Sequence, residues 1–318
     1  MTIVTEKSKV RRPNDVCYAV SSEFEPINSV LERCRFPLAK DANIISPIFD
    51  LAVSGGPDSL AMTVLALAAG LRIRIWHFDH QIRDTSTLEA EWVAEFAESI
   101  GAEFSLVSHK IEAGSNLEAR ARKARKESFP RDIATGHTMD DQVETLLINL
   151  LRGSGTAGLS AMRIGAAKPI LALRKAETSQ ICKVVGLNPI HDASNDSTQF
   201  LRNRIRHELV PSLNDLARRD VVPVLFRSAE IFGLESDFLD GLACDIDPTN
   251  RVQLREANLV VRYRSIRRAA SQITGYPPSF DAMTQLSNLI DGSGNFRLQI
   301  AGHLDVSCVR NWIAYLKV

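Results

Sequence analysis

Paired cysteines, long apolar runs and an excess of charge of either sign are all missing from this sequence of 318 residues. The five cysteines are scattered and none forms a C-x-x-C pair, which argues against a disulfide framework or a cysteine-ligated metal cluster and favours a reducing compartment. No stretch approaches the length of a membrane span and no apolar signal core opens the chain, so we expect a cytoplasmic protein without a membrane partner. Basic and acidic residues balance at 38 each, so any nucleic-acid binding must come from local clusters of charge.

The most distinctive stretch that is present is a loop between an apolar run (47–53) and a helix-forming run (60–69). The loop consists of Ser54, Gly55, Gly56, Pro57, Asp58 and Ser59. A strand, a glycine turn and a helix in this order point backbone N–H groups and the helix dipole at an anion. The loop itself has neither a Walker A ending nor the pattern G-x-G-x-x-G. The sequence therefore predicts a phosphate-binding loop of another kind, and the alternative is an ordinary turn with Ser and Asp as caps.

Strand-like and helix-like segments alternate around this loop. The predicted strands are 47–53, 72–78, 103–107, 131–135 and 169–173. The predicted helices are 23–35, 60–69, 87–100, one that opens at Ser115, 138–151 and 176–185. This alternation predicts an α/β fold, a doubly wound parallel sheet covered on both faces, with ligands at the carboxyl ends of the strands. We expect a partly disordered N-terminal extension (1–45), the sheet domain (46–215), and a helix over 222–239 that leads into a smaller α+β domain (216–318).

Acidic and histidine side chains lie in the loop and after two of the strands. The candidates are Asp58, Asp79, His137, Asp140 and Asp141. Carboxylates converging on one phosphate site would repel a polyphosphate unless a magnesium ion or a cationic substrate were present. Two of them also have a structural alternative, because Asp79 can cap a turn and Asp141 can cap a helix together with Thr138. The spacing alone leaves both explanations open.

Arginines form two groups further along the chain. Arg202, Arg204 and Arg206 occupy every second position, a spacing that suits the phosphate oxygens of a nucleic acid. A second group over 251–268 includes Arg262 and Arg264. A solvated helix face is the alternative for the second group. With aromatic residues at only 6%, stacking on exposed bases is not predicted from composition.

These motifs, in this order, resemble the tRNA(Ile)-lysidine synthetase family of the N-type ATP pyrophosphatases (PP-loop enzymes) in its short form. The resemblance covers about residues 47–213 and rests on seven stretches: 54–59, Asp79-His80-x-x-Arg83, 116–122, 136–145, 151–159, Asp192-x-Ser194-Asn195 and 202–206. Three features depart from the family: a longer arm before the sheet, Lys126 after Arg125 where the family often has Tyr, and an end at Val318 without the second C-terminal domain of longer members.

The resemblance implies ATP-dependent ligation of L-lysine to C2 of cytidine 34 in the CAU anticodon of tRNA(Ile), through an adenylated tRNA, with AMP and pyrophosphate released. It implies that loop 54–59 binds ATP, that Asp58 and Asp141 hold Mg2+, and that the C-terminal domain binds tRNA. The residues it implies for catalysis are Asp58, Asp141, His137 and Asp79; for lysine, Asp140 and Asp192; and for tRNA, Arg202, Arg204, Arg206, Arg262 and Arg264. The division of roles among the four catalytic candidates is a hypothesis, and a homodimer is left open.

Three rival functions fit the sequence less well. A tRNA thiolase of the same superfamily needs cysteines for sulfur transfer, and Cys182 is the only cysteine of the sheet domain after the loop. A non-enzymatic, ATP-gated RNA-binding protein would not need both Asp58 and Asp141. A synthetase linked to an amidotransferase would need a glutaminase nucleophile segment, which the sequence does not contain.

Overall fold

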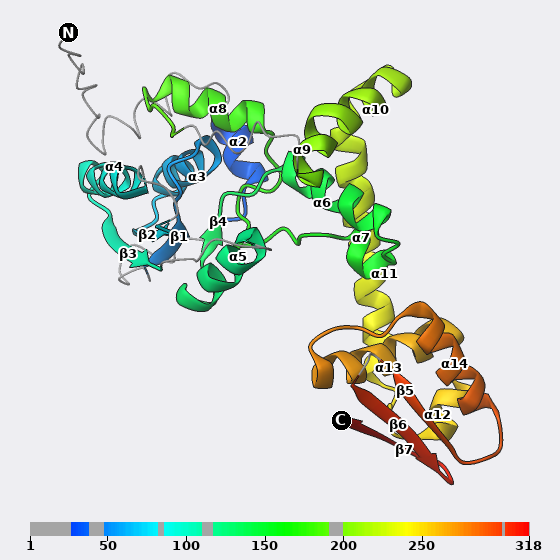
Figure 1. Ribbon diagram of the computed structural model, residues 1–318. Coiled ribbons are helices and arrows are strands. Elements are labelled where there is room, and N and C mark those ends of the chain that lie inside the picture. Colours follow the sequence, from blue (N-terminus) through cyan, green and yellow to red (C-terminus); the bar gives the residue numbers. More distant parts are fainter. Residues whose placement is uncertain are drawn as a thin grey trace. The chain divides into compact units, whose positions relative to one another are not determined.

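The computed structural model describes residues 27–37, 48–81, 86–109, 117–190, 200–300 and 303–317. The chain divides into two compact units, 1–229 and 230–318 (Figure 1). The first contains a sheet of four strands in the order β3-β2-β1-β4, and every neighbouring pair is parallel. The strands are β1 (Phe49–Ala52), β2 (Ile73–Asp79), β3 (Glu103–Ser108) and β4 (Ala134–Thr135). This arrangement confirms the predicted α/β fold with a parallel sheet.

The helices of the first unit follow the strands in the expected alternation. They are α2 (Ile27–Arg33), α3 (Pro57–Ala68), α4 (Ser86–Ser99), α5 (Leu117–Ser128), α6 (Met139–Leu151), α7 (Thr156–Leu159), α8 (Lys175–Val184), α9 (Leu201–Arg204), the π-helix η2 (Ile205–Leu209) and α10 (Val210–Ala217). α3 and α4 lie on one side of the sheet and α5 on the other (Figure 1). The connection between β3 and β4 returns past β1, so the strand order reverses between β1 and β4. Ligands of such sheets bind outside the carboxyl ends of the strands at this reversal.

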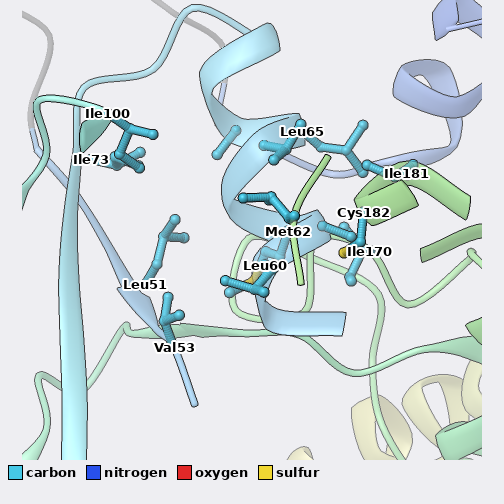
Figure 2. Packing of buried hydrophobic residues seen from close by; sticks show 14 of the residues in the cluster. Leu51, Val53, Leu60, Met62, Leu65, Ile73, Ile100, Ile170, Ile181 and Cys182 are labelled. Atoms are coloured by element: carbon cyan, nitrogen blue, oxygen red, sulfur yellow. The ribbon is translucent and has the colours of Figure 1, made fainter. Parts of the chain in front are cut away.

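The main core of the first unit lies between the strands and α3. Leu60, Met62 and Leu65 of α3 are fully buried. Figure 2 shows them between the strand side chains and α8, whose Ile181 and Cys182 complete the cluster. Burial of one such aliphatic side chain contributes roughly 1.5–3 kcal/mol. Since α3 begins in the phosphate loop, this packing also fixes the loop to the sheet.

The predicted strand over 169–173 is wrong. This segment forms consecutive turns, in which the N–H of Leu171 bonds to the carbonyl of Lys168 and that of Leu173 to the carbonyl of Ile170. Ile170, Leu171 and Leu173 are nevertheless fully buried. An apolar run shows that a segment is buried, but it does not show whether a neighbouring strand offers it a hydrogen-bonding edge. The predicted fourth strand is also shortened, to Ala134–Thr135.

The second unit is a small α+β module, as predicted. α11 (Val222–Cys244) begins in the first unit and ends in the second. The other helices are α12 (Arg251–Glu256), α13 (Leu259–Thr274) and α14 (Phe280–Asp291). The antiparallel strands β5 (Phe296–Ile300), β6 (Leu304–Val309) and β7 (Trp312–Lys317) follow and close the module. Among the helices within the described ranges, none is long and apolar enough to cross a bilayer.

A fully buried arginine holds the second unit together. The Arg251 guanidinium donates to the carbonyl oxygens of Leu289, Ile290, Gly292 and Gly294 at 2.6–3.0 Å. These carbonyls lie at and just beyond the end of α14, where a helix leaves its last C=O groups without intrahelical partners. Arg251 therefore acts as a helix cap made by a distant side chain.

Candidate active site at the carboxyl ends of β1 and β4

The predicted phosphate loop connects β1 to α3 and is held in shape by one of its own serines. Gly56 is the N-cap of α3, and Pro57, with its fixed φ, is the first helical residue. The Ser59 hydroxyl donates to the Gly56 carbonyl at 2.9 Å and accepts from the Ser54 N–H at 3.3 Å. Gly55 has φ +83°, a conformation that favours glycine. Ser59 is buried, whereas Ser54 is exposed and can offer its hydroxyl to a ligand.

Gly136 brings the loop after β4 against the phosphate loop. A Cβ atom on Gly136 would lie 2.8 Å from the carbonyl oxygen of Asp58 and 2.9 Å from the nitrogen of Ser59. Both atoms belong to the backbone, so only glycine fits without moving one of the loops. The two carboxyl ends that flank the strand reversal are therefore in direct contact, and α6 begins next to the phosphate loop.

The ammonium group of Lys175 connects two of the predicted carboxylates. Its Nζ lies 2.9 Å from Oδ2 of Asp58 and 3.1 Å from Oδ1 of Asp141. Asp58 also accepts a hydrogen bond from the Thr178 hydroxyl, one turn further along α8. Asp58 and Asp141 thus share one cation, and their joint role in catalysis or metal binding remains a prediction. Lys175 was missed, because it lies 117 residues from Asp58 and no motif spacing joins the two.

The environments of Asp58 and Asp141 push their pKa values in opposite directions. Burial raises the pKa of Asp58 above its ordinary value, although Lys175 and Thr178 act the other way. Burial would also raise the pKa of Asp141, but Lys175, Arg202 and the Thr138 N–H together hold it well below the usual range. A carboxylate with a raised pKa suits proton transfer near neutral pH, whereas one with a lowered pKa remains an anion.

Asp141 is also the helix cap that the sequence offered as its alternative role. The Thr138 N–H and hydroxyl both donate to Asp141 Oδ2, at 2.9 and 2.8 Å. Its other oxygen, Oδ1, faces Lys175. The two explanations are therefore compatible, because one oxygen serves the helix start and the other serves the site.

A buried glutamate fastens two arginines beside Asp141. Arg202 and Arg206 each place Nε 2.6 Å from an oxygen of Glu144, whose side chain is only 3% exposed. Arg202 also lies 3.3 Å and Arg206 3.7 Å from Asp141 Oδ1. Sequence reasoning placed both arginines on tRNA and gave Glu144 no role. The spacing of four residues between Arg202 and Arg206 could have predicted a shared partner, because it puts both side chains on one face of a helix.

The remaining arginines predicted to bind tRNA differ in exposure. Arg204 is exposed and forms an i,i+4 pair with Glu208 at 3.6 Å. Arg262 is buried and pairs with Asp291 at 2.8 Å. Arg264 pairs with Asp240 at 2.6 Å. The contacts of Arg262 and Arg264 give both of them a structural task within the second unit.

Asp140 and the predicted residues at the ends of β2 and β4 face other partners. Asp140 accepts from Nε and Nη2 of Arg174, each at 3.1 Å, and from the backbone N–H of Lys175 at 2.9 Å. The Oδ1 of Asp79, the last residue of β2, accepts from the Gln81 N–H at 2.8 Å. This contact is the turn cap given above as its alternative role. The ring Nδ1 of His137 lies 2.8 Å from the Thr135 hydroxyl.

Several predicted residues lie outside the described ranges. They are Arg83, Ser115, Asn116, Asp192, Ser194 and Asn195. The assignment of Asp192 to lysine therefore remains a prediction. That of Asp140 also remains one, because its contacts with Arg174 and Lys175 do not test it.

The donor set at the loop suits a magnesium ion that is shared with a polyphosphate. Within the described ranges, no three His, Cys, Asp or Glu side chains are grouped as a metal cage. Asp58 and Asp141 provide two carboxylates on either side of one cation. Mg2+ is usually held by one or two carboxylates, with phosphate and water oxygens completing its shell. The two aspartates thus fit Mg2+ brought by a nucleotide better than a dedicated all-protein site.

Comparison with known proteins finds one matching domain family and several relatives. The model of the PP-loop domain matches residues 39–213. The tRNA(Ile)-lysidine synthase of Rhodococcus jostii (strain RHA1) is 36% identical over 204 residues, which are 61% of this chain and 63% of that protein. The one of Gloeobacter violaceus (strain ATCC 29082 / PCC 7421) is 32% identical over 278 residues, which are 80% of this chain and 86% of that protein. The matched segment thus spans less than two thirds of the Rhodococcus relative and most of the Gloeobacter one.

Proposed function

Because this chain belongs to the PP-loop domain family and, within it, to the tRNA(Ile)-lysidine synthases, we propose that it ligates lysine to C2 of cytidine 34 in the CAU anticodon of tRNA(Ile). ATP activates the C2 oxygen as an adenylate and releases pyrophosphate. The ε-amine of lysine then forms the C–N bond at C2, and AMP leaves.

The observation that carries the proposal is the seating of a primary ammonium group between Asp58 and Asp141, beside the phosphate loop. The group belongs to Lys175 of the chain itself. It supports the view that a lysine ε-ammonium, the reactive end of the proposed substrate, is compatible with this carboxylate pair in size, charge and hydrogen bonding. A phosphate loop and an ammonium site next to each other are what the two half-reactions require.

In the first half-reaction, the loop holds the polyphosphate of ATP. Its backbone N–H groups and the start of α3 offer partial positive charge. Ser54 can add a hydroxyl donor from the exposed side of the loop. When bound, Mg2+ would lie at Asp58 and Asp141 and compensate charge on the departing pyrophosphate.

In the second half-reaction, the two aspartates act on the amine. Only the neutral amine is a nucleophile, so a proton must leave the ammonium group first. Asp58, with its raised pKa, is suited to accept that proton, while Asp141 stays ionised and holds the amine in place. Arg202 and Arg206 keep Asp141 ionised through their contacts with its Oδ1.

Transfer of labelled lysine to an unmodified tRNA(Ile) transcript, with ATP and magnesium, tests the reaction. A methionine tRNA with the same anticodon is the control. We expect incorporation into the first tRNA alone. Cleavage of ATP to AMP without lysine incorporation would refute lysine as the nucleophile while retaining the PP-loop chemistry.

Two substitutions, each measured in lysine transfer and in pyrophosphate exchange, test the roles of the two aspartates. We expect Asp58→Asn and Asp141→Asn to lower lysine transfer by at least about 100-fold, the usual scale for removing a general base or a charge-stabilising group. Pyrophosphate exchange reports the first half-reaction alone. Asp132→Asn, at an exposed aspartate, is the matched control and should keep both rates. Unchanged rates in Asp141→Asn would remove that residue from the mechanism.

Sulfur transfer, the nearest rival, is disfavoured by the state of Cys182. Burial, with a smaller contribution from Asp58, raises the pKa of its thiol to about 12. A sulfur-transfer cysteine needs an accessible thiolate with a lowered pKa. Cys182 is instead a buried member of the core on α8.

A further inference from the structure

Lys175 occupies the position that the two aspartates would offer to a metal ion. Its Nζ lies within 3.1 Å of one oxygen of each. An ammonium group and a magnesium ion cannot share that position, since both need the same carboxylate oxygens and both are positive.

The charges around the position are already balanced. Three carboxylates, those of Asp58, Asp141 and Glu144, face three cations. The cations are Lys175, Arg202 and Arg206. A divalent ion added to this neutral cluster would create an excess of two positive charges in a partly buried site, which is costly in a low-dielectric environment.

Of the three cations, Lys175 is the one suited to leave. Arg202 and Arg206 are both fastened to Glu144, whose side chain is 3% exposed. The contacts of Lys175 Nζ are with Asp58 and Asp141, the two residues that would receive the metal. Lysine is a point charge on a flexible four-carbon stem, and its side chain here is 31% exposed.

A polyphosphate on the loop offers Lys175 a new partner. Asp58 is itself a residue of the phosphate loop, so the ammonium group already lies at the edge of the loop. Phosphate oxygens that bind the loop would attract it strongly.

We infer that Lys175 is a positioning residue that sets the order of binding: its ammonium excludes divalent metal from Asp58 and Asp141 until a bound polyphosphate draws it away. This inference rests on the proposed use of ATP with magnesium at this site. It makes the aspartate pair a metal site only in the presence of nucleotide.

Binding of Mn2+ to the full-length protein without nucleotide tests the inference. Free Mn2+ is measured by electron paramagnetic resonance for the wild type, Lys175→Met, Lys175→Arg and Lys183→Met. Lys183 is an exposed lysine of the same helix and serves as the control. We expect Lys175→Met to bind Mn2+ at least about tenfold more tightly than the other three proteins. Damage to the fold would not produce a gain in affinity. If Lys175→Met is unstable, Lys175→Gln replaces it, with the same expectation.

Three results would overturn the inference, two from binding of Mn2+ and one from binding of ATP. Equal Mn2+ affinity in Lys175→Met and the wild type would show that the ammonium does not exclude the metal. Equal affinity in Lys175→Arg and Lys175→Met would show that its charge is not the cause. In a second arm, binding of ATP in EDTA should be at least about tenfold weaker in Lys175→Met, and no weakening would refute the movement of the ammonium to phosphate. If the Mn2+ and ATP affinities are as expected but the protein does not transfer lysine to tRNA(Ile), the proposed function is refuted and the inference about Lys175 is not.

Discussion

At the scale of single residues, Gly136 makes the contact between the two loops possible. We expect Gly136→Ala to lower the free energy of unfolding by about 1–3 kcal/mol, because the added methyl group would meet the backbone of Asp58 and Ser59 at 2.8–2.9 Å. ATP affinity should fall as well, since the phosphate loop must shift. Urea unfolding and equilibrium dialysis measure the two effects.

Gly165→Ala is the matched control for this change. A Cβ on Gly165 meets nothing within 4 Å, so stability should change by no more than about 0.5 kcal/mol. Equal effects of the two substitutions would contradict the assigned contact.

Asp141 should make stability depend on acidity in a defined direction. Its pKa is lower in the folded protein than in the unfolded chain, so its contribution is fully present above the ordinary value of about 3.9 and is lost as the pH falls towards the folded value. We expect the free energy of unfolding to fall less steeply below about pH 4 in Asp141→Asn than in the wild type. Urea unfolding between pH 3 and 6 measures the slope. Asp132→Asn should retain the wild-type slope, and a wild-type slope in Asp141→Asn would refute the assignment.

At the scale of elements, the segment from α9 to η2 is fastened to α6 by Glu144. Glu144→Gln keeps the shape but removes the charge shared by Arg202 and Arg206. We expect a loss of about 2–4 kcal/mol in the free energy of unfolding, because a buried ion pair is broken. Glu208→Gln removes a carboxylate from an exposed pair and should cost at most about 1 kcal/mol. Urea unfolding compares the two, and an equal cost would contradict the assigned burial.

The same segment shows where a sequence pattern can mislead. The alternation of Arg202, Arg204 and Arg206 suggests three equivalent side chains if the chain is extended. In the observed helical turns, Arg202 and Arg206 face Glu144, while Arg204 faces Glu208. The residue types were informative, but the partners followed from helical periodicity. Arg204 is exposed, so it is the most accessible of the three arginines to tRNA, their predicted partner.

At the scale of the whole molecule, each unit has a core of its own. Arg251→Met should therefore weaken the second unit and leave the first intact. The carbonyls of Leu289 and Gly294 would lose the donor that Arg251 provides, while those of Ile290 and Gly292 would keep Arg255. We expect a loss of at least about 3 kcal/mol in the free energy of unfolding of this unit. Hydrogen exchange followed by mass spectrometry should show faster exchange in peptides over 251–317, with those of β1 and β2 unchanged.

Arg267→Met is the control for this experiment, since Arg267 is exposed on α13 of the same unit. It should leave exchange unchanged throughout. Faster exchange of β1 in Arg251→Met would mean that the two units do not unfold separately.

Sequence reasoning reached the parallel sheet and the phosphate loop because both depend on local signals. Apolar runs, glycines and helix caps lie within a few residues of what they determine, as at Gly55 and Gly56. The role of Lys175 was not predicted, because the tertiary fold determines which ionic side chains meet, and Lys175 lies 117 residues from Asp58. The turns at 169–173 were not predicted for a related reason, because an apolar run shows burial but not whether the segment pairs as a strand.

The distance along the chain between Asp58 and Lys175 also has a consequence during synthesis. At about 5–20 residues per second, the ribosome needs roughly 6–23 s to extend the nascent chain from one residue to the other. During that interval the loop and α3 have been made, but neither the counter-charge of Asp58 nor the apolar side chains of α8 exist. The phosphate loop is thus synthesised well before α8, which completes the site. Until α8 has been synthesised, the loop of the nascent chain lacks these partners.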